Sequence, residues 1–338
     1  MTETAAGGAP VAARVRTVRG PILAADLGGT KITAGLVTPG GVVVARRTVP
    51  TPAAEGPNAV VAAVTAALVA VRDDVAAAGD ATVGAPVAVG IGSAGVVDSA
   101  TGRIISATDA IPGWAGTELG PRVSRALGLE TQVLNDVHAH ALGEATYGAG
   151  EGKSSLLLVA VGTGVGGAVV RDGVVVTGAR GVAGHVGHVA MPEAIGVPCT
   201  CGRSGHVEGL ASGPGVLAAY QRAGREAADT REVVARAEAG EELAAEVLRT
   251  CSFAIGRMIG GLLNVTDPEV VVLTGGMAGA GTLWWQGVRD GARHEAIDLV
   301  AGTAVLPATA GPDAALLGAA HVVRSRGAAR TGPTEGPR

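Results

Sequence analysis

The sequence predicts an α/β protein of two lobes, built on a duplicated strand–turn–strand core with a central cleft. The main observation is an internal repeat: ILAADLGGTKITAGLVTPGGVVVARR begins at Ile22, and LLLVAVGTGVGGAVVRDGVVVTGAR begins at Leu156. Each copy contains an apolar strand, a Gly/Thr-rich turn, a second β-branched strand, a glycine-containing reversal and a third strand. Strands and helical segments alternate through the rest of the chain, which favours the α/β class. A repeat of this kind implies two lobes of related topology.

Composition restricts the class of protein and its partners. Of the 338 residues 47% are hydrophobic but only 2% are aromatic, so the core must consist of Ala, Val, Leu and Ile. A net charge of −4 argues against a broad nucleic-acid surface. The N-terminal segment has no signal-peptide pattern, and the uncharged part of the apolar run 58–78 is shorter than the roughly 20 residues of a membrane span. Three cysteines cannot form a disulfide framework. We therefore expect a reduced, cytoplasmic protein that binds neither membrane nor nucleic acid.

The elements between and after the repeats follow from local signals. A helix is expected over 58–78, with Asn58 as its N-cap and Gly79 just after its end. The strand PVAVGIGSAG, a helix near 117–128 and the strand TQVLND follow, and TQVLND is expected to begin the second lobe. Later helices are expected over 214–227, 231–238 and 241–264, followed by the strand EVVVLTGG, a helix, the strand TAVLPA and the helix DAALLGAAHVVRS.

These elements predict a division of the chain into lobes and tails. The lobes are expected to cover residues 21–133 and 134–310, with a terminal helix over 311–326 that packs back on the first lobe. The Ala/Gly-rich segment 1–20 and the Pro/Gly/Arg-rich segment 327–338 are expected to be disordered tails.

The Gly/Thr turns of the two repeats are candidate phosphate-binding sites. Two glycines let backbone N–H groups approach a phosphate, and a threonine adds a hydroxyl donor. A single such turn would favour a plain hairpin, but two matched turns could clamp a polyphosphate from both sides of a cleft. A third Gly-Gly turn, after EVVVLTGG, could line the nucleoside, or be a plain strand-to-helix turn. The candidates are Asp26 for magnesium, and Gly28, Gly29, Thr30, Lys31, Gly162, Thr163, Gly164, Gly275 and Gly276 for the nucleotide.

Asn135 and Asp136 end an apolar strand just before a helix. Active sites of α/β proteins gather at the carboxyl ends of strands. An aspartate there could accept the proton of a hydroxyl that attacks a γ-phosphate. The alternative is an N-cap pair, because both residue types are favoured at helix starts. His138 and His140, two residues apart, cannot share a helix face and are expected to be surface or cap residues.

Six motifs in order resemble the ROK family (repressors, open reading frames and sugar kinases). They are DxGGTK, GIGxxGxVD, PGW, NDxxxxALGE, GTGxGG and CxCGxxGxxE, and the resemblance runs from about Ile22 to Arg324. It implies the actin-like ATPase (ribonuclease-H-like) fold and a glucokinase-like homodimer or homotetramer that transfers the γ-phosphate of ATP, with Mg²⁺, to a primary sugar hydroxyl. It also implies that Asp136 is the general base and that the sugar is bound by Asn135, His188, Glu208, His185 and Gly95.

The same resemblance implies a zinc site at HVGHVAMPEAIGVPCTCGRSGHVEG, residues 185–209. The family site uses one His and three Cys, which correspond here to His188, Cys199, Cys201 and His206, so a histidine replaces the last cysteine. Two thiolates and two imidazoles still form a closed tetrahedral set, which is typical of a structural Zn²⁺. The alternative is a pair of free thiols on a loop. The third cysteine, Cys251, is expected in the core.

Two departures from the family pattern fall on the sugar-reading side. His185 stands where the family's sugar kinases usually carry Glu, and Ala110, next to Asp109, stands where they usually carry Asn. Neutral histidine can accept one hydrogen bond but brings no fixed negative charge. We therefore expect phosphoryl transfer to be intact and substrate preference to be altered. Glucose, an amino or N-acetyl hexose and a sugar-like cyclitol all remain open, as does a polyphosphate donor.

Two other functions compete with that of a kinase. A sugar-sensing regulator would need a DNA-reading module, which does not fit in the roughly twenty residues before Ile22. A non-catalytic sugar-binding protein would not need Asp136 or the two Gly/Thr turns. The retained motifs favour an ATP-dependent sugar kinase.

Overall fold

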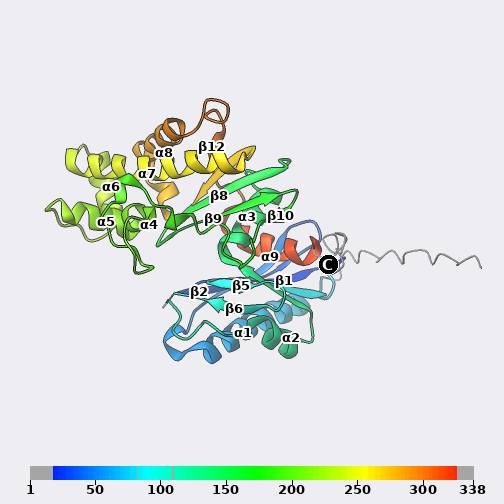
Figure 1. Cartoon of the computed structure of the whole chain (residues 1–338). Coiled ribbons are helices and arrows are strands. Elements are labelled where there is room, and N and C mark those ends of the chain that lie inside the picture. The colour runs from blue at the N-terminus through cyan, green and yellow to red at the C-terminus, as the bar shows by residue number, and fades with distance from the viewer. Residues whose placement is uncertain (1–17, 81, 109, 326–338) are drawn as a thin grey trace, which may run out of the picture.

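The computed structural model describes residues 18–80, 82–108 and 110–325, and it has two lobes, each built on a five-stranded mixed sheet (Figure 1). In the first sheet the strand order is β3 (Val43–Pro50), β2 (Lys31–Val37), β1 (Ile22–Leu27), β4 (Ala88–Ser93), β7 (Thr131–Asn135). In the second it is β10 (Val174–Val175), β9 (Val165–Arg171), β8 (Ser155–Val161), β11 (Val270–Thr274), β12 (Ala304–Pro307).

The predicted duplication of the core is confirmed by the pairing of these strands. In both sheets the first three strands of the repeat run antiparallel, and two later strands join in parallel. The second copy is shortened, because β10 has two residues where β3 has eight. The added strands β4, β7, β11 and β12 are parallel, so their carboxyl ends meet at one edge of each sheet.

The predicted lobe of one strand is wrong. The strand TQVLND was expected to begin the second lobe, but β7 pairs with β4 in the first sheet, from Val89 opposite Thr131 to Ser93 opposite Asn135. The predicted boundary between residues 133 and 134 therefore falls inside a strand. The second sheet begins with β8 at Ser155.

Helices α1 (Pro57–Ala78) and α2 (Leu119–Leu127) cover the outer face of the first sheet (Figure 1). Asn58 is not the N-cap that was predicted: Gly56 holds that position and Pro57 opens the helix, where its missing N–H costs nothing. The predicted helix end is confirmed, since Gly79 has a φ of 67°. A small hairpin, β5 (Val96–Asp98) and β6 (Arg103–Ser106), follows β4.

The second lobe carries more helices. They are α4 (Val207–Ala211), α5 (Gly213–Arg222), α6 (Thr230–Glu238), α7 (Glu242–Thr266) and α8 (Gly281–Glu295). The helix predicted over 214–227 is too long, because α5 ends at Arg222 and Gly224 takes a φ of 84°, in which helices stop. Cys251 is fully buried in α7, as expected, and Trp284 is fully buried in α8.

Two helices lie between the sheets: α3 (Asp136–Tyr147) and α9 (Ala314–Ser325) (Figure 1). They pack in one core with residues of both sheets, from Ile22 and Leu134 to Leu158 and Val272. Glycines permit backbone contact here. A Cβ at Gly318 would lie 1.8 Å from the carbonyl oxygen of Ala139.

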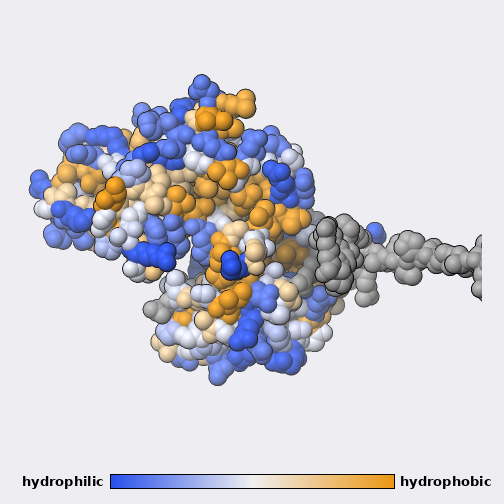
Figure 2. All heavy atoms as spheres, in the orientation of Figure 1, coloured by the Kyte–Doolittle hydropathy of each residue, from blue (hydrophilic) through white to orange (hydrophobic). Residues whose placement is uncertain are grey.

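In the view of Figure 2, hydrophilic side chains prevail along the outer edges of both lobes, and hydrophobic side chains gather between these edges. Within the part of the chain that is described, no helix is both long and apolar enough to cross a membrane. The predicted tail segments lie almost wholly at 1–17 and 326–338, outside the described residues.

Candidate functional site

The junction of β7 and α3 holds the candidate base. The Asn135 side chain accepts hydrogen bonds from the backbone N–H groups of Val137 (3.0 Å) and His138 (3.2 Å), so it caps α3. Its Nδ2 donates to the carbonyl of Gly95 (3.0 Å) and to Asp136 Oδ1 (2.8 Å). The cap and the site are therefore the same arrangement: the residue that starts the helix also orients the carboxylate. Gly95 meets the site through its backbone.

Burial raises the pKa of the Asp136 carboxyl, against the opposing effects of the Val137 N–H group and of His140. Burial also raises the pKa of Asp26, at the end of β1, where His140 lowers it and the charge of Asp136 raises it. Two carboxylates and one imidazole therefore share one electrostatic environment at the carboxyl end of the first sheet. A carboxylate with a raised pKa is a stronger proton acceptor once ionised.

A cavity of about 390 Å³ lies beside this junction and is the candidate acceptor site. Of the residues predicted to bind the substrate, Asn135, His185, His188 and Glu208 line it, whereas Gly95 does not. The lining residues that sequence reasoning did not assign to the site are Thr108, Val137, His138, Ala160, Val165, Gly166, Gly167, Gly184, Thr200 and Cys201.

The structure adds to what was expected of two lining residues: the burial of His138 and the hydrogen bonds of Glu208. His138 was expected at the surface or in a cap, but it is 4% exposed, and its Nε2 lies 3.0 Å from the carbonyl oxygen of Ala183. Glu208 has both oxygens engaged by protein: Oε2 accepts from the N–H of Val165 (2.9 Å), and Oε1 accepts from the hydroxyl of Thr200. Glu208 therefore fixes the GTGxGG turn as well as lining the cavity.

A second cavity, of about 720 Å³, lies on the other side of the GTGxGG turn, between α5, α6 and the loop after β11. Gly162 lines both cavities, Thr163 and Gly276 line the second, and Gly164 and Gly275 line the first. Further lining residues come from helices without a recognisable motif: Pro214, Leu217, Asp229, Thr230, Arg231, Val234, Ala235, Glu238, Met277, Gly279 and Ala280, with Gly213. Sequence reasoning missed them because they carry no short pattern.

Glycine is required by geometry at Gly275. It has a φ of 90°, and a Cβ there would lie 2.4 Å from the carbonyl oxygen of Val161. The turn at Gly162 is also held from the helical side, because its carbonyl accepts from the N–H of Gly213 at 2.7 Å. These contacts let the walls of the two cavities approach each other closely.

The first-lobe turn is separate from both cavities. Its residues Gly28, Gly29, Thr30 and Lys31 connect β1 to β2, and none is among the residues that line the two cavities. The N–H of Gly28 donates to the carbonyl of Lys31 at 3.0 Å. This bond is typical of a plain hairpin, the alternative to a phosphate-binding turn. This turn belongs to the first lobe, whereas the residues that line the second cavity belong to the second lobe.

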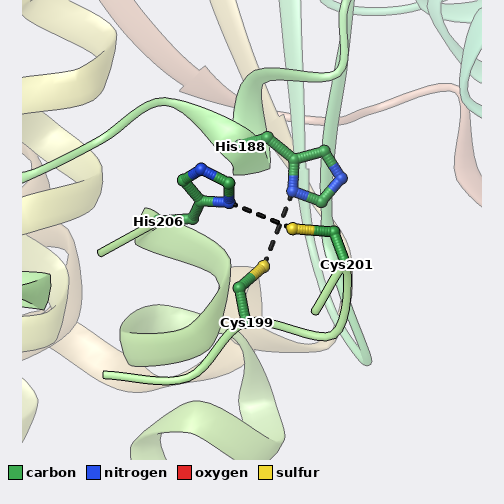
Figure 3. A group of neighbouring side chains, drawn as sticks. All are labelled: His188, Cys199, Cys201 and His206. Carbon is green, nitrogen blue, oxygen red and sulfur yellow. Dashed lines mark hydrogen bonds between the residues drawn. The ribbon is translucent and has the colours of Figure 1, made fainter. Parts of the chain in front are cut away.

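Four side chains of the loop between β10 and α4 and of the start of α4 converge on one point: His188, Cys199, Cys201 and His206 (Figure 3). Their ligand atoms all lie within 4.8 Å of one another. His188 Nδ1 lies 3.6 Å from Cys199 Sγ, and His206 Nδ1 lies 3.3 Å from Cys201 Sγ. Zn²⁺ bonds of about 2.3 Å to sulfur and about 2.0 Å to nitrogen place tetrahedral ligand atoms roughly 3.3–3.8 Å apart. The residues therefore fit a four-coordinate metal.

Comparison with known proteins gives consistent results. The model of the ROK family matches residues 22–326. An N-acetylmannosamine kinase of Shigella flexneri is 34% identical over 257 residues, which are 75% of this chain and 82% of the relative. The crystal structure of a ROK hexokinase from Thermus thermophilus superposes with a TM-score of 0.78 at 32% identity, covering 89% of this chain and 97% of that one. A ROK family glucokinase from Streptomyces griseus, in complex with glucose and AMPPNP, superposes with a TM-score of 0.74 at 29% identity, covering 90% and 100%.

Proposed function

This chain belongs to the ROK family, and from that premise we propose that it is an ATP-dependent sugar kinase that phosphorylates the primary hydroxyl of a hexose or hexose-like substrate. The observation that carries the proposal is that the cavity lined by Asn135 and Val137, the two neighbours of Asp136 in the chain, and the cavity beside α5 and α6 share Gly162. A donor in one and an acceptor in the other would meet at that turn. The glucose and AMPPNP held by the Streptomyces griseus relative support this pair of ligands.

On the acceptor side, Asp136 is the proposed general base. Its carboxylate is held by Asn135 and by the N–H of Val137, so it needs no reorganisation when a hydroxyl approaches. It accepts the proton of the attacking hydroxyl, whose oxygen forms a bond to the γ-phosphorus as the bond to the leaving ADP oxygen breaks.

On the donor side, the backbone of Gly162, Thr163 and Gly164 would hold the phosphates. The carboxylate oxygens of Asp26 are of the type that binds a Mg²⁺ ion or its water ligands. Magnesium, when bound, neutralises charge that develops on the transferred phosphoryl group. Closure of the lobes would bring Gly28, Gly29 and Thr30 to the phosphates and exclude water.

The His188, Cys199, Cys201 and His206 set is proposed to hold a structural Zn²⁺. Four protein ligands leave no open position, so the metal would supply rigidity, not Lewis-acid chemistry at the substrate. His188 faces its ligand partners through Nδ1, which leaves Nε2 as the nitrogen available for a sugar hydroxyl.

The substrate preference is proposed to differ from that of the family's sugar kinases that carry a glutamate at the position matching His185. His185 lines the acceptor cavity, and Glu208, the carboxylate that also lines it, already accepts bonds from Val165 and Thr200. Ala110, the other departure from the family pattern, does not line this cavity but lies against the first-lobe turn, where a Cβ at Gly29 would lie 3.1 Å from the Cβ of Ala110. The proposal therefore rests on His185, which brings no carboxylate, and on Glu208, whose two oxygens are already engaged.

The test is ATP consumption by the purified protein with glucose, mannose, N-acetylated hexosamines, amino-hexoses and seven-carbon cyclitols. We expect selective turnover of one class, and loss of at least about 100-fold in kcat for Asp136→Asn with ATP binding retained. Asp74→Asn, at an exposed ion pair with Arg47, is the matched control and should keep full activity. Turnover by Asp136→Asn equal to that control would remove the assignment of the base. No turnover of any sugar by the natural protein would contradict the kinase proposal.

A further inference from the structure

The segment 183–188, here the acceptor loop, carries His185 and His188, which both line the acceptor cavity. On one side the loop lies against β9. The N–H of Gly167 donates to the carbonyl of Gly184 at 2.7 Å, and a Cβ at Gly184 would lie 2.1 Å from the carbonyl oxygen of Gly167. The contact with this strand is therefore backbone to backbone.

A hydrogen bond of the His138 side chain joins the loop to α3. His138 Nε2 lies 3.0 Å from the carbonyl oxygen of Ala183, next to Gly184. A carbonyl oxygen only accepts, so Nε2 must carry the hydrogen, and in the neutral ring Nδ1 is then a lone-pair nitrogen. Burial lowers the pKa of His138, against the opposing effects of the Ala183 hydrogen bond and of Asp136, and so favours the neutral ring. Its side chain is almost fully enclosed, although it also lines the acceptor cavity.

His138 is two residues after Asp136 in the first turn of the same helix. Its hydrogen bond to Ala183 therefore connects the acceptor loop to α3, the helix that carries the proposed base. We propose that His138 is a positioning residue, which holds the acceptor loop in register with the base and so sets the affinity for the sugar. This inference rests on the proposed kinase function.

A loop that must be ordered when the sugar arrives binds it more weakly than a loop that is already in place. Removal of His138 also leaves the Ala183 carbonyl without its partner. The base itself keeps its bonds to Asn135 and Val137. The loss should therefore appear in sugar affinity, with little change in kcat at saturating sugar or in the KM for ATP.

The chain offers a matched control in His321 of α9. Its Nε2 lies 3.1 Å from the carbonyl oxygen of Gly173, on another loop of the same lobe, and burial lowers its pKa as well. The bond has the same chemistry and lies on a helix beside α3, but it ties the turn between β9 and β10, which carries no cavity residue.

The experiment uses the panel named above: glucose, mannose, N-acetylated hexosamines, amino-hexoses and seven-carbon cyclitols. The Kd of each is measured by calorimetry without ATP, and kcat and KM are measured separately, for the natural protein and for His138→Leu, His138→Gln, His138→Asn and His321→Leu. We expect His138→Leu to raise the sugar Kd about tenfold. His138→Gln, whose amide nitrogen reaches nearly as far as Nε2, should restore most of that loss. His138→Asn, too short for Ala183, should behave as Leu does and replaces it if His138→Leu does not fold.

His321→Leu should lower the melting temperature but leave the sugar Kd within about twofold. The inference is overturned if His138→Leu and His138→Asn leave the sugar Kd unchanged, or if His321→Leu raises it equally. Sugar binding without ATP consumption by the natural protein would refute the kinase proposal alone, because the Kd comparison would still decide the role of His138. Absence of any sugar binding would overturn both.

Discussion

Gly318→Ala tests the contact between the two central helices and, through it, the placement of the base. An alanine Cβ at position 318 would lie 1.8 Å from the carbonyl oxygen of Ala139, where separations under 3.0 Å are essentially never found. The obstacle is backbone, so α3 and α9 must separate by more than 1 Å. The methyl group gains about 1 kcal/mol of helix propensity, and overpacking costs about 1–3 kcal/mol. We therefore expect a net loss of up to about 2 kcal/mol in the free energy of unfolding.

The same displacement should reach the chemistry, because Ala139 lies one turn beyond Asp136 in α3. Misplacement of a catalytic group by about 1 Å can cost about 100-fold in rate. The assay combines chemical denaturation with kcat at saturating ATP and sugar. The matched control is Gly261→Ala in the interior of α7, where a Cβ meets nothing within 4 Å, so this change should stabilise by about 0.5–1 kcal/mol with unchanged kcat. If Gly318→Ala were as stable and as active as Gly261→Ala, the helix contact and its link to the base would be refuted.

Four further outcomes are expected. Burial raises the pKa of Asp136, and the base acts in its ionised form. The value of kcat should therefore fall as the pH drops through an apparent pKa above the ordinary carboxyl range. A pH–rate profile in which kcat falls only within the ordinary carboxyl range would contradict this. His185→Glu should change the ranking of sugars in the ATP-consumption panel, and an unchanged ranking would show that His185 is tolerated without effect. Cys199→Ser should lower zinc content, measured by atomic absorption, together with thermal stability; equal metal content would remove the zinc proposal. Burial raises the pKa of Cys251 to about 12, so this thiol should resist alkylation until the protein unfolds, as mass spectrometry of the labelled protein would report.

The duplicated sheet could be predicted because its signal is local and occurs twice. Each copy carries its own apolar strands and its own Gly/Thr turn, so the fold repeats what the sequence repeats. The lobe of β7 could not be predicted from order along the chain. Parallel pairing joins Val89 to Thr131 across more than forty residues, and nothing at Thr131 itself indicates its partner.

Some residues of the candidate site could likewise be predicted from the sequence, and others could not. Asn135 and Asp136 were found because a polar pair that ends a buried strand is visible in a short window. His138 was misjudged because helical spacing describes only neighbours within the helix, whereas the carbonyl that binds it lies forty-five residues away. The residues that α6 contributes to the second cavity, such as Thr230 and Val234, were missed because cavity walls formed by helix packing need no motif.

Helix α9 has a consequence for the order in which the molecule becomes complete. Its residues 314–325 close a core to which both sheets contribute, from Ile22 in β1 to Val272 in β11. During synthesis, the part of the two inner faces that α9 covers therefore stays exposed until this last described helix has left the ribosome, although α3 is already present. Each lobe lacks part of its core until then, so a nascent chain that stops before residue 314 would keep apolar surface open to chaperones.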